Sequence, residues 1–400
     1  MSFNPNPDLL PVTVLSGFLG AGKTTLLTHL LHNRQGRKIA IIVNDMSEIN
    51  IDARLLDQDG AMVRGEEKMV ELSNGCICCT LRGDLIEEVS ALAKQGRFDH
   101  LVIESTGISE PLPVAQTFSF RDDKGICLGD VARLDNLVTV IDAASFLDEY
   151  CSADTLVDRQ LGLSDQDARP LVNLLVQQVE YANVLMLNKT DRVSDEDLEV
   201  LSNILRKLNP TAQQVRTQRG VVEVAQLLDQ PRFDAATFEQ TPGWLRELHG
   251  EHTPETEEYG ITSFVYSARR PFAPQRLQGW FDQAWPGVIR SKGFFWLATR
   301  FDLVGSWSQA GAACEYGLAG RFWAGVDRAR WPKSEAFDEI MSRIWRSPWG
   351  DRRQEIVIIG ADMDKEHIIA AFDQCLLTDE EMALGVEGWT SLPDPFAPWG

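Results

Sequence analysis

The chain has 400 residues, of which 44% are hydrophobic and 24% are charged, and its formal net charge at pH 7 is −21. This length exceeds what one hydrophobic core usually serves, so we expect two domains. The acidic balance argues against nucleic acid and anionic membranes as partners, because both are themselves negatively charged. No run resembles a leader sequence, and no stretch approaches the roughly 20 apolar residues that span a membrane, so we expect a cytoplasmic protein.

A glycine-rich loop lies between the first predicted strand, residues 12–15, and the first predicted helix, residues 24–31. It reads GFLGAGKT and fits the G-x-x-x-x-G-K-[ST] pattern of phosphate-binding loops. Its glycines let backbone N–H groups point at phosphate oxygens near a helix N-terminus, whose partial positive charge favours anions. We expect Lys23 to reach the β and γ phosphates of a nucleotide and Thr24 to offer its hydroxyl to Mg²⁺. The predicted site comprises Gly17, Gly20, Ala21, Gly22, Lys23, Thr24 and Thr25.

The second predicted strand, residues 38–43, is a β-branched run of the kind that is buried on both faces. Asp45 follows its end, and residues 46–65 after it are polar and irregular, which is typical of a mobile segment. Asp45 is therefore a candidate Mg²⁺ or switch ligand, on its position alone.

Three cysteines follow the next predicted strand, residues 69–72, and precede a helix at residues 81–94. Seven cysteines in total, with Cys76, Cys78 and Cys79 almost adjacent, do not form the pattern of a disulfide framework. Soft thiolates select Zn²⁺, Cu(I) or iron, and three of them leave one tetrahedral position open, which suits a metal that must leave again. Glu48 is a candidate for the fourth position in one nucleotide state. A redox pair or inert buried thiols are the alternatives.

A further buried strand, residues 101–104, ends in an acid and a tight turn. We place Glu104 near the water shell of Mg²⁺, and we expect Gly107 to give its backbone N–H a clear approach to the γ-phosphate. The alternative for Glu104, a charge that faces solvent, is less favoured because the residues before it are apolar.

The predicted strands at residues 137–142 and 184–188 complete an alternation of strands and helices, which predicts a doubly wound, mostly parallel sheet with ligands at the carboxyl ends of its strands. Asn188, Lys189 and Asp191 match the N-K-x-D pattern that reads guanine. A carboxylate accepts hydrogen bonds from N1–H and the 2-amino group of guanine, whereas adenine offers no matching donors. The pattern therefore favours GTP over ATP. Strand termination and helix capping are the alternative for Asn188 and Asp191.

The composition shifts after residue 228, and we divide the chain there. The expected parts are a nucleotide-binding domain at 1–228, an acidic linker at 229–258, a smaller α+β domain at 259–378 and a loosely held tail at 379–400. In the smaller domain we expect strands at residues 260–266, 293–299, 302–307 and 355–359, and helices at 274–284, 335–345 and 365–377. Its tryptophans, including Trp280, Trp285, Trp296 and Trp323, are expected in the core.

These motifs, in this order, resemble the CobW family of metal-chaperone GTPases, and the G-C-I-C-C run at residues 75–79 makes the resemblance specific. Within the family the chain is similar to the longer zinc-responsive type represented by YciC. The resemblance implies a P-loop GTPase domain related to those of UreG and HypB, and a CobW-type C-terminal domain. It also implies hydrolysis of GTP to GDP and phosphate, coupled to transfer of Zn²⁺ from Cys76, Cys78 and Cys79 to a client metalloprotein.

Several alternatives remain open. Similar proteins activate iron- or cobalt-dependent nitrile hydratases, so the metal and the client are undetermined. The chain has only six histidines, whereas some relatives carry histidine-rich stretches, so metal storage is less expected than delivery. A metal sensor or storage protein with a structural nucleotide is the rival of another class, and an ATP-dependent kinase is disfavoured by Asp191. A homodimer that forms in one nucleotide state is also left open.

Overall fold

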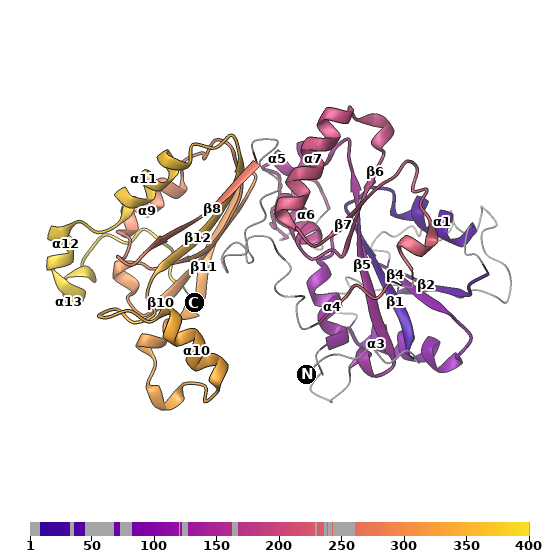
Figure 1. Cartoon of the computed structure of the whole chain (residues 1–400), viewed down its shortest axis with the longest axis horizontal. Helices are drawn as coiled ribbons and strands as arrows, with labels where there is room; N and C mark the ends of the chain where they lie inside the picture. Colours follow the sequence, from indigo (N-terminus) through magenta and orange to yellow (C-terminus); the bar gives the residue numbers. More distant parts are fainter. Residues whose placement is uncertain are drawn as a thin grey trace. The chain divides into compact units, whose positions relative to one another are not determined.

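The computed structural model describes residues 9–32, 36–44, 68–72, 82–119, 121, 127–161, 167–228, 230–235, 238, 242 and 261–399. The chain divides into two compact units, Met1–Gly243 and Trp244–Gly400, drawn in Figure 1.

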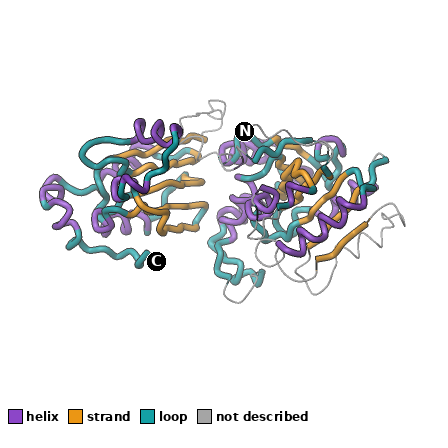
Figure 2. Tube along the Cα trace, turned by 90° about the horizontal axis from the view of Figure 1, so that it is seen from below, coloured by secondary structure: helices purple, strands orange, loops and turns teal. Residues whose placement is uncertain are grey.

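The first unit is built on a seven-stranded sheet whose neighbouring strands all run parallel. From edge to edge the strands are β3 (Lys68–Leu72), β2 (Ile39–Asn44), β4 (His100–Glu104), β1 (Leu10–Ser16), β5 (Ala132–Asp142), β6 (Val184–Asn188) and β7 (Gln213–Arg216). The helices are α1 (Lys23–His32), α3 (Arg82–Gln95), α4 (Pro111–Ser119), α5 (Phe146–Cys151), α6 (Leu171–Glu180) and α7 (Asp195–Leu208). Helices lie on both sides of the strands (Figure 2), so the predicted doubly wound fold is confirmed.

Because helices cover both faces of the sheet, its central strands carry apolar residues at successive positions. On β2, Ile41 packs into the core shared with Leu27 of α1, whereas Ile42 packs into the core shared with Val89 of α3. Successive residues of a strand point to opposite faces, so a sheet covered on both faces needs apolar residues at every position.

The carboxyl ends of four strands meet at one edge of this sheet. Leu15 of β1 lies opposite Glu104 of β4 and Val138 of β5, and Asp142 of β5 lies opposite Asn188 of β6. The register therefore brings the loops after β1, β4, β5 and β6 to the same edge.

One strand of the first unit was not predicted. β7 reads QQVR, lies at the edge of the sheet and is only partly buried. An edge strand packs against few neighbours, so it lacks the apolar run by which the other strands are recognised. Two residues of the predicted linker, Phe233 and Phe238, pack against the core of the first unit.

The second unit contains a five-stranded antiparallel sheet. Its order is β11 (Ala313–Arg321), β10 (Leu303–Ala310), β9 (Val288–Phe295), β12 (Gln354–Ala361) and β8 (Ile261–Ala268). The helices are α9 (Pro274–Phe281), α10 (Glu335–Ile344), α11 (Lys365–Cys375), α12 (Asp379–Ala383) and α13 (Gly385–Trp389). α9 and α11 lie on one side of the sheet (Figure 1), where they enclose an aromatic core. The predicted α+β class is confirmed.

Two strands of this sheet differ from the sequence prediction. β11 was missed because it is a mostly exposed edge strand with two glycines. β9 begins five residues before the predicted strand and includes the polar residues Arg290 and Ser291, both buried. Arg290 Nη1 donates to Ser308 Oγ at 2.9 Å and to Gln309 O at 3.1 Å. These hydrogen bonds offset the free-energy cost of burying the guanidinium group.

The expectation of a loosely held tail is wrong. Trp389 is fully buried in a cluster with Trp296, and its Nε1 donates to Glu381 O at 2.8 Å. Asp394 accepts hydrogen bonds from Arg300 Nε at 2.9 Å and from Thr299 Oγ1 at 2.6 Å. Burial alone would raise the pKa of Asp394, but these bonds hold it below its ordinary value. The tail is therefore part of the second unit.

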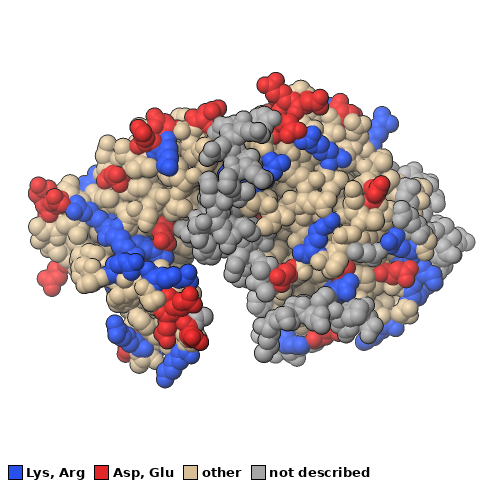
Figure 3. All heavy atoms as spheres, viewed as in Figure 1, with Lys and Arg blue, Asp and Glu red and all other residues tan. Residues whose placement is uncertain are grey.

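Acidic and basic side chains are interspersed on the face of the molecule in Figure 3. The net charge of −21 thus does not appear on that face as one continuous acidic surface. Among the described residues, no helix has the length and apolar character needed to cross a membrane.

Truncation of the buried tail tryptophan tests the packing of the tail. We expect Trp389→Ala to lower the free energy of unfolding of the second unit by about 3–5 kcal/mol, because it leaves a cavity among aromatic side chains. Leu384→Ala, at an exposed position of the same tail, is the control and should cost no more than about 0.5 kcal/mol. Scanning calorimetry of the full chain measures both, and equal small losses would show that the tail is not anchored.

Candidate functional site

The loop between β1 and α1 has a shape that only glycine permits at two positions. Gly17 has φ +135°, and a Cβ there would lie 2.3 Å from Val140 O of β5. Gly22 has φ +107°, and a Cβ there would lie 2.4 Å from Asn188 Nδ2. Left-handed backbone and close neighbours both exclude a side chain. The loop is therefore packed directly against β5 and the end of β6.

Lys23 begins α1 and turns its side chain back over this loop. Its Nζ donates to Gly17 O at 2.9 Å and to Phe18 O at 3.4 Å, and the residue is buried. An ammonium group held over a glycine loop at a helix N-terminus fits a phosphate ligand, whose oxygens would replace the carbonyl partners. Thr24 is half-buried beside it, and Thr25 is exposed.

The side-chain amide of Asn188 connects this loop to a second one. Asn188 Nδ2 donates to Ala21 O at 2.9 Å, and Asn188 Oδ1 accepts from Gly220 N at 3.0 Å. The residue is buried. Both polar atoms of the amide bond to backbone, so the side chain of Asn188 connects the phosphate loop to the loop after β7.

The remaining residues of the motif, Lys189 to Asp191, directly follow β6. Lys189 adopts left-handed backbone, φ 60°, and its Nζ donates to Asp142 Oδ2 at 2.6 Å. Thr190 donates through its Oγ1 to Thr217 O at 3.2 Å. Asp191 follows in a short 3-10 turn, where its carboxylate is exposed. A non-glycine residue in left-handed backbone is strained, and such strain gathers at functional sites.

The loop after β4 contacts the phosphate loop from the other side. Glu104 is buried at the end of β4. A Cβ on Gly107 would lie 2.8 Å from Leu19 N, so the two backbones approach closely. In the part of the chain that the structure describes, Thr106 Oγ1 is buried and has no hydrogen-bond partner. A buried hydroxyl without a partner beside this loop fits a polar ligand there.

These residues together form a cradle suited to a nucleotide. The N–H groups of the glycine loop and the ammonium group of Lys23 are donors that suit phosphate oxygens, and Asp191 is an exposed acceptor. Hydroxyl and carboxylate oxygens are the ligands that Mg²⁺ prefers, so Thr24 and Glu104 fit the ion.

Five predicted site residues, Asp45, Glu48, Cys76, Cys78 and Cys79, lie outside the described residues. Within the described ranges, no group of three or more His, Cys, Asp or Glu side chains could hold a metal ion.

Two residues of this edge had no role in the sequence analysis. Asp142 ends β5 and fixes Lys189, and Gly220 binds the oxygen of Asn188. An acid at the end of a buried strand was the available signal for Asp142. Gly220 follows the unpredicted strand β7, so no pattern marked its loop.

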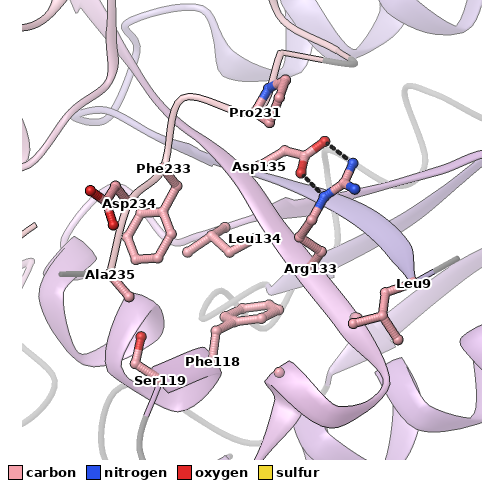
Figure 4. Close-up of a pocket in the computed structure, with 12 residues that line it drawn as sticks. Leu9, Phe118, Ser119, Arg133, Leu134, Asp135, Pro231, Phe233, Asp234 and Ala235 are labelled. Carbon is pink, nitrogen blue, oxygen red and sulfur yellow. Dashed lines mark hydrogen bonds and ion pairs between the residues drawn. The ribbon is translucent and has the colours of Figure 1, made fainter. Parts of the chain in front are cut away.

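A cavity of about 230 Å³ lies at the opposite end of β1 and β5 and is not part of this site (Figure 4). Phe118, Leu134 and Phe233 surround it, and the only ion pair drawn there joins Arg133 to Asp135. The cavity is mainly apolar and lies at the amino ends of these strands, whereas parallel sheets bind ligands at the carboxyl ends.

Two family models match this chain, one in each unit. Residues 11–216 match the family model described as CobW/HypB/UreG, nucleotide-binding domain, and residues 261–376 match that of the cobalamin synthesis protein cobW C-terminal domain. A zinc-regulated GTPase metalloprotein activator 1 from Dictyostelium discoideum is 46% identical over 400 residues, which cover 97% of this chain and 84% of that protein. A zinc chaperone CobW from a Sinorhizobium species is 34% identical over 234 residues, 56% of this chain and 63% of that protein.

Among solved structures, the Zn(II)-bound YjiA GTPase from E. coli aligns over 92% of this chain and 99% of that chain, with 22% identity and a TM-score of 0.41. The nucleotide-binding family model spans more than half of the chain, and the Dictyostelium relative aligns along nearly all of it. The chain therefore belongs to the CobW family, with a CobW/HypB/UreG nucleotide-binding domain followed by a CobW C-terminal domain.

Proposed function

We propose that this protein is a cytoplasmic GTPase that hydrolyses GTP to GDP and phosphate and uses the nucleotide to transfer Zn²⁺ to a client metalloprotein. The observation that carries the GTPase part is the meeting of three features at one sheet edge: Lys23 over its glycine loop, the Gly107 turn, and the Asn188 to Asp191 turn. The names of the relatives, a zinc-regulated GTPase activator and a zinc chaperone, support the metal part.

Hydrolysis of GTP needs mainly positioning and charge stabilisation from the protein. Lys23 and the loop N–H groups would stabilise the negative charge that develops on the transferring phosphoryl group. Thr24 would hold Mg²⁺ directly, Glu104 would bind its water shell, and Asp45 is a further candidate ligand. Bound Mg²⁺ would supply charge neutralisation between the β and γ phosphates. Turnover is expected to be slow, since the nucleotide-binding motifs contain no glutamine or arginine that could orient water.

Recognition of guanine is assigned to Asp191. Its exposed carboxylate would accept two hydrogen bonds from guanine and none from adenine. Asn188 would act indirectly, because its amide already bonds to Ala21 O and Gly220 N.

The metal is assigned to the thiolates of Cys76, Cys78 and Cys79, with Glu48 as the fourth ligand in one nucleotide state. Zn²⁺ here is cargo. In the sequence Asp45 and Glu48 follow β2, and Val43 of β2 pairs with Glu104 of β4, which supports a response of this segment to the γ-phosphate. Insertion of iron or cobalt is the alternative that the same thiolates permit.

Removal of the loop lysine tests the phosphate site. We expect Lys23→Ala to weaken GTP binding about 10- to 100-fold and to abolish hydrolysis, because a charged hydrogen-bond donor to the phosphates is lost. Isothermal titration and phosphate release measure these effects, and Lys94→Ala, an exposed lysine on α3, is the control. Thr24→Ala should instead raise the Mg²⁺ concentration needed for hydrolysis. Hydrolysis by Lys23→Ala at the native rate would contradict the assignment.

Exchange of the guanine-reading acid tests base selection. We expect the native protein to prefer GTP over ATP by about 100-fold or more, and Asp191→Asn to prefer xanthine nucleotides, because an amide can donate where a carboxylate only accepts. Competition binding with GTP, ATP and XTP measures the preference. Asp195→Asn, an exposed acid at the start of α7, should leave it unchanged. The assignment is wrong if native protein binds GTP and ATP equally.

Chelator competition tests the coupling between nucleotide and metal. We expect one Zn²⁺ to bind tightly, and to bind more tightly with a non-hydrolysable GTP analogue than with GDP. Linkage requires Zn²⁺ to tighten the GTP analogue by the same factor. The Cys76, Cys78 and Cys79 triple serine variant should lose the site, whereas serine at Cys151 and Cys314, both exposed, should retain it. Stoichiometric zinc binding by the triple variant would refute the site, and equal affinities in the two nucleotide states would refute the coupling alone.

A further inference from the structure

Helix α6 carries a buried amide in an apolar surrounding. The helix reads LVNLLVQQVE, and Gln178 is only 1% exposed. Its Nε2 donates to Gly107 O at 3.3 Å and to Ser109 O at 3.2 Å. Burial of an amide is unfavourable unless its hydrogen bonds are replaced, and these two carbonyls replace them. Both belong to the loop after β4, 71 and 69 residues away in the sequence.

This loop is a tight turn whose carbonyls point into the protein. Ser109 N donates to Thr106 O at 3.1 Å, and Ser109 Oγ donates to the same oxygen at 2.9 Å. With the bonds from Gln178, the carbonyls of Thr106, Gly107 and Ser109 are all engaged. Within the described residues, the N–H groups of Gly107 and Ile108 donate no hydrogen bond to the protein. The turn therefore directs its carbonyls inward and leaves these donors for a ligand.

The backbone of Gln178 is linked through Thr139 to the residue that precedes the phosphate loop. Thr139 Oγ1 donates to Gln178 O at 2.7 Å, and Thr139 Oγ1 is 2.9 Å from Ser16 Oγ. Ser16 is the residue immediately before Gly17. Gln178 is thus linked to the residue before the phosphate loop indirectly, through Thr139, and it is bonded to the Gly107 turn directly through its side chain.

The amide has a direct effect on this turn. A leucine or methionine at position 178 would continue the apolar face of α6, but it would leave the carbonyls of Gly107 and Ser109 without the hydrogen bonds that the amide donates. The two hydrogen bonds of the amide both go to the turn that contacts Leu19 of the phosphate loop. The contact restricts the peptide planes of the turn, and their orientation decides where the N–H groups of Gly107 and Ile108 point.

We propose that Gln178 is a positioning residue for GTP hydrolysis: it holds the Gly107 turn in the orientation that binds the γ-phosphate, and so distinguishes GTP from GDP. This inference rests on the proposed GTPase function. GDP lacks the γ-phosphate, so its binding does not depend on the turn.

Gln178→Met tests the role, because methionine has similar size and cannot donate a hydrogen bond. We expect affinity for GDP within twofold of native protein, and affinity for a non-hydrolysable GTP analogue and kcat each lowered about tenfold. Gln177→Met is the matched control, since Gln177 lies on the same helix and is half-buried. Its affinities and kcat should remain native. Equal losses for GDP and the GTP analogue, or none, in Gln178→Met would overturn the inference.

Hydrogen exchange of native protein provides a second measurement that needs no variant. The peptide spanning residues 106–110 should exchange more slowly with the GTP analogue than with GDP, and Gln178→Met should reduce that difference. Absence of the difference in native protein overturns the inference even if Gln178→Met fails to fold. If native protein neither binds nor hydrolyses GTP, the proposed function itself fails. If it does both and Gln178→Met matches Gln177→Met, only the role of Gln178 fails.

Discussion

One buried amide constrains the whole carboxyl edge of the parallel sheet. Asn188 bonds to Ala21 O through its nitrogen and to Gly220 N through its oxygen, so the phosphate loop and the loop after β7 are held at fixed distances from β6. A buried amide that loses either partner is left unsatisfied, and this penalty opposes independent movement of the two loops. A Cβ on Gly22 would lie only 2.4 Å from the nitrogen of the same amide, so the glycine of the motif is required by packing as well as by backbone conformation.

The other loops of the edge are held by side chains in a similar way. Lys189 would be strained in left-handed backbone by itself, and its bond to Asp142 stabilises it there. Gln178 holds the turn after β4 through two hydrogen bonds from its side-chain amide. In each case a polar group on a neighbouring element satisfies the backbone or the charge of a loop. The loops that would contact a ligand therefore need little rearrangement on binding, because the conformational entropy of ordering them is already lost when the protein folds.

The second unit depends on aromatic packing instead. Trp296, Trp307 and Trp389 are almost completely buried, and the indole nitrogens of Trp307 and Trp389 donate to Ser291 Oγ at 2.7 Å and to Glu381 O at 2.8 Å. Large aromatic side chains bury much area, and their N–H groups need a partner inside. The tail contributes Trp389 to the aromatic cluster around Trp296, and its Asp394 accepts a hydrogen bond from Arg300, which explains why the tail belongs to the folded unit.

The amino-acid sequence determined those elements and motifs whose conformation depends on residues that are close together in the chain. The strand, glycine loop and helix around Lys23 follow from residues 12–31, and the N-K-x-D turn follows from four residues at the end of a buried run, so the doubly wound fold and the likeness to the CobW family could be recognised from the sequence. The cysteine site remains a sequence prediction. Only the tertiary structure decided the roles of Asp142, Gln178 and Gly220, which act on loops 47, 71 and 32 residues away. It also decided the burial of Arg290 and the docking of the tail. The hydrogen-bond partner of a polar residue in an apolar run cannot be identified from the sequence alone. That partner lies on an element distant in the sequence, and only the strand order and register of the folded chain bring the two together.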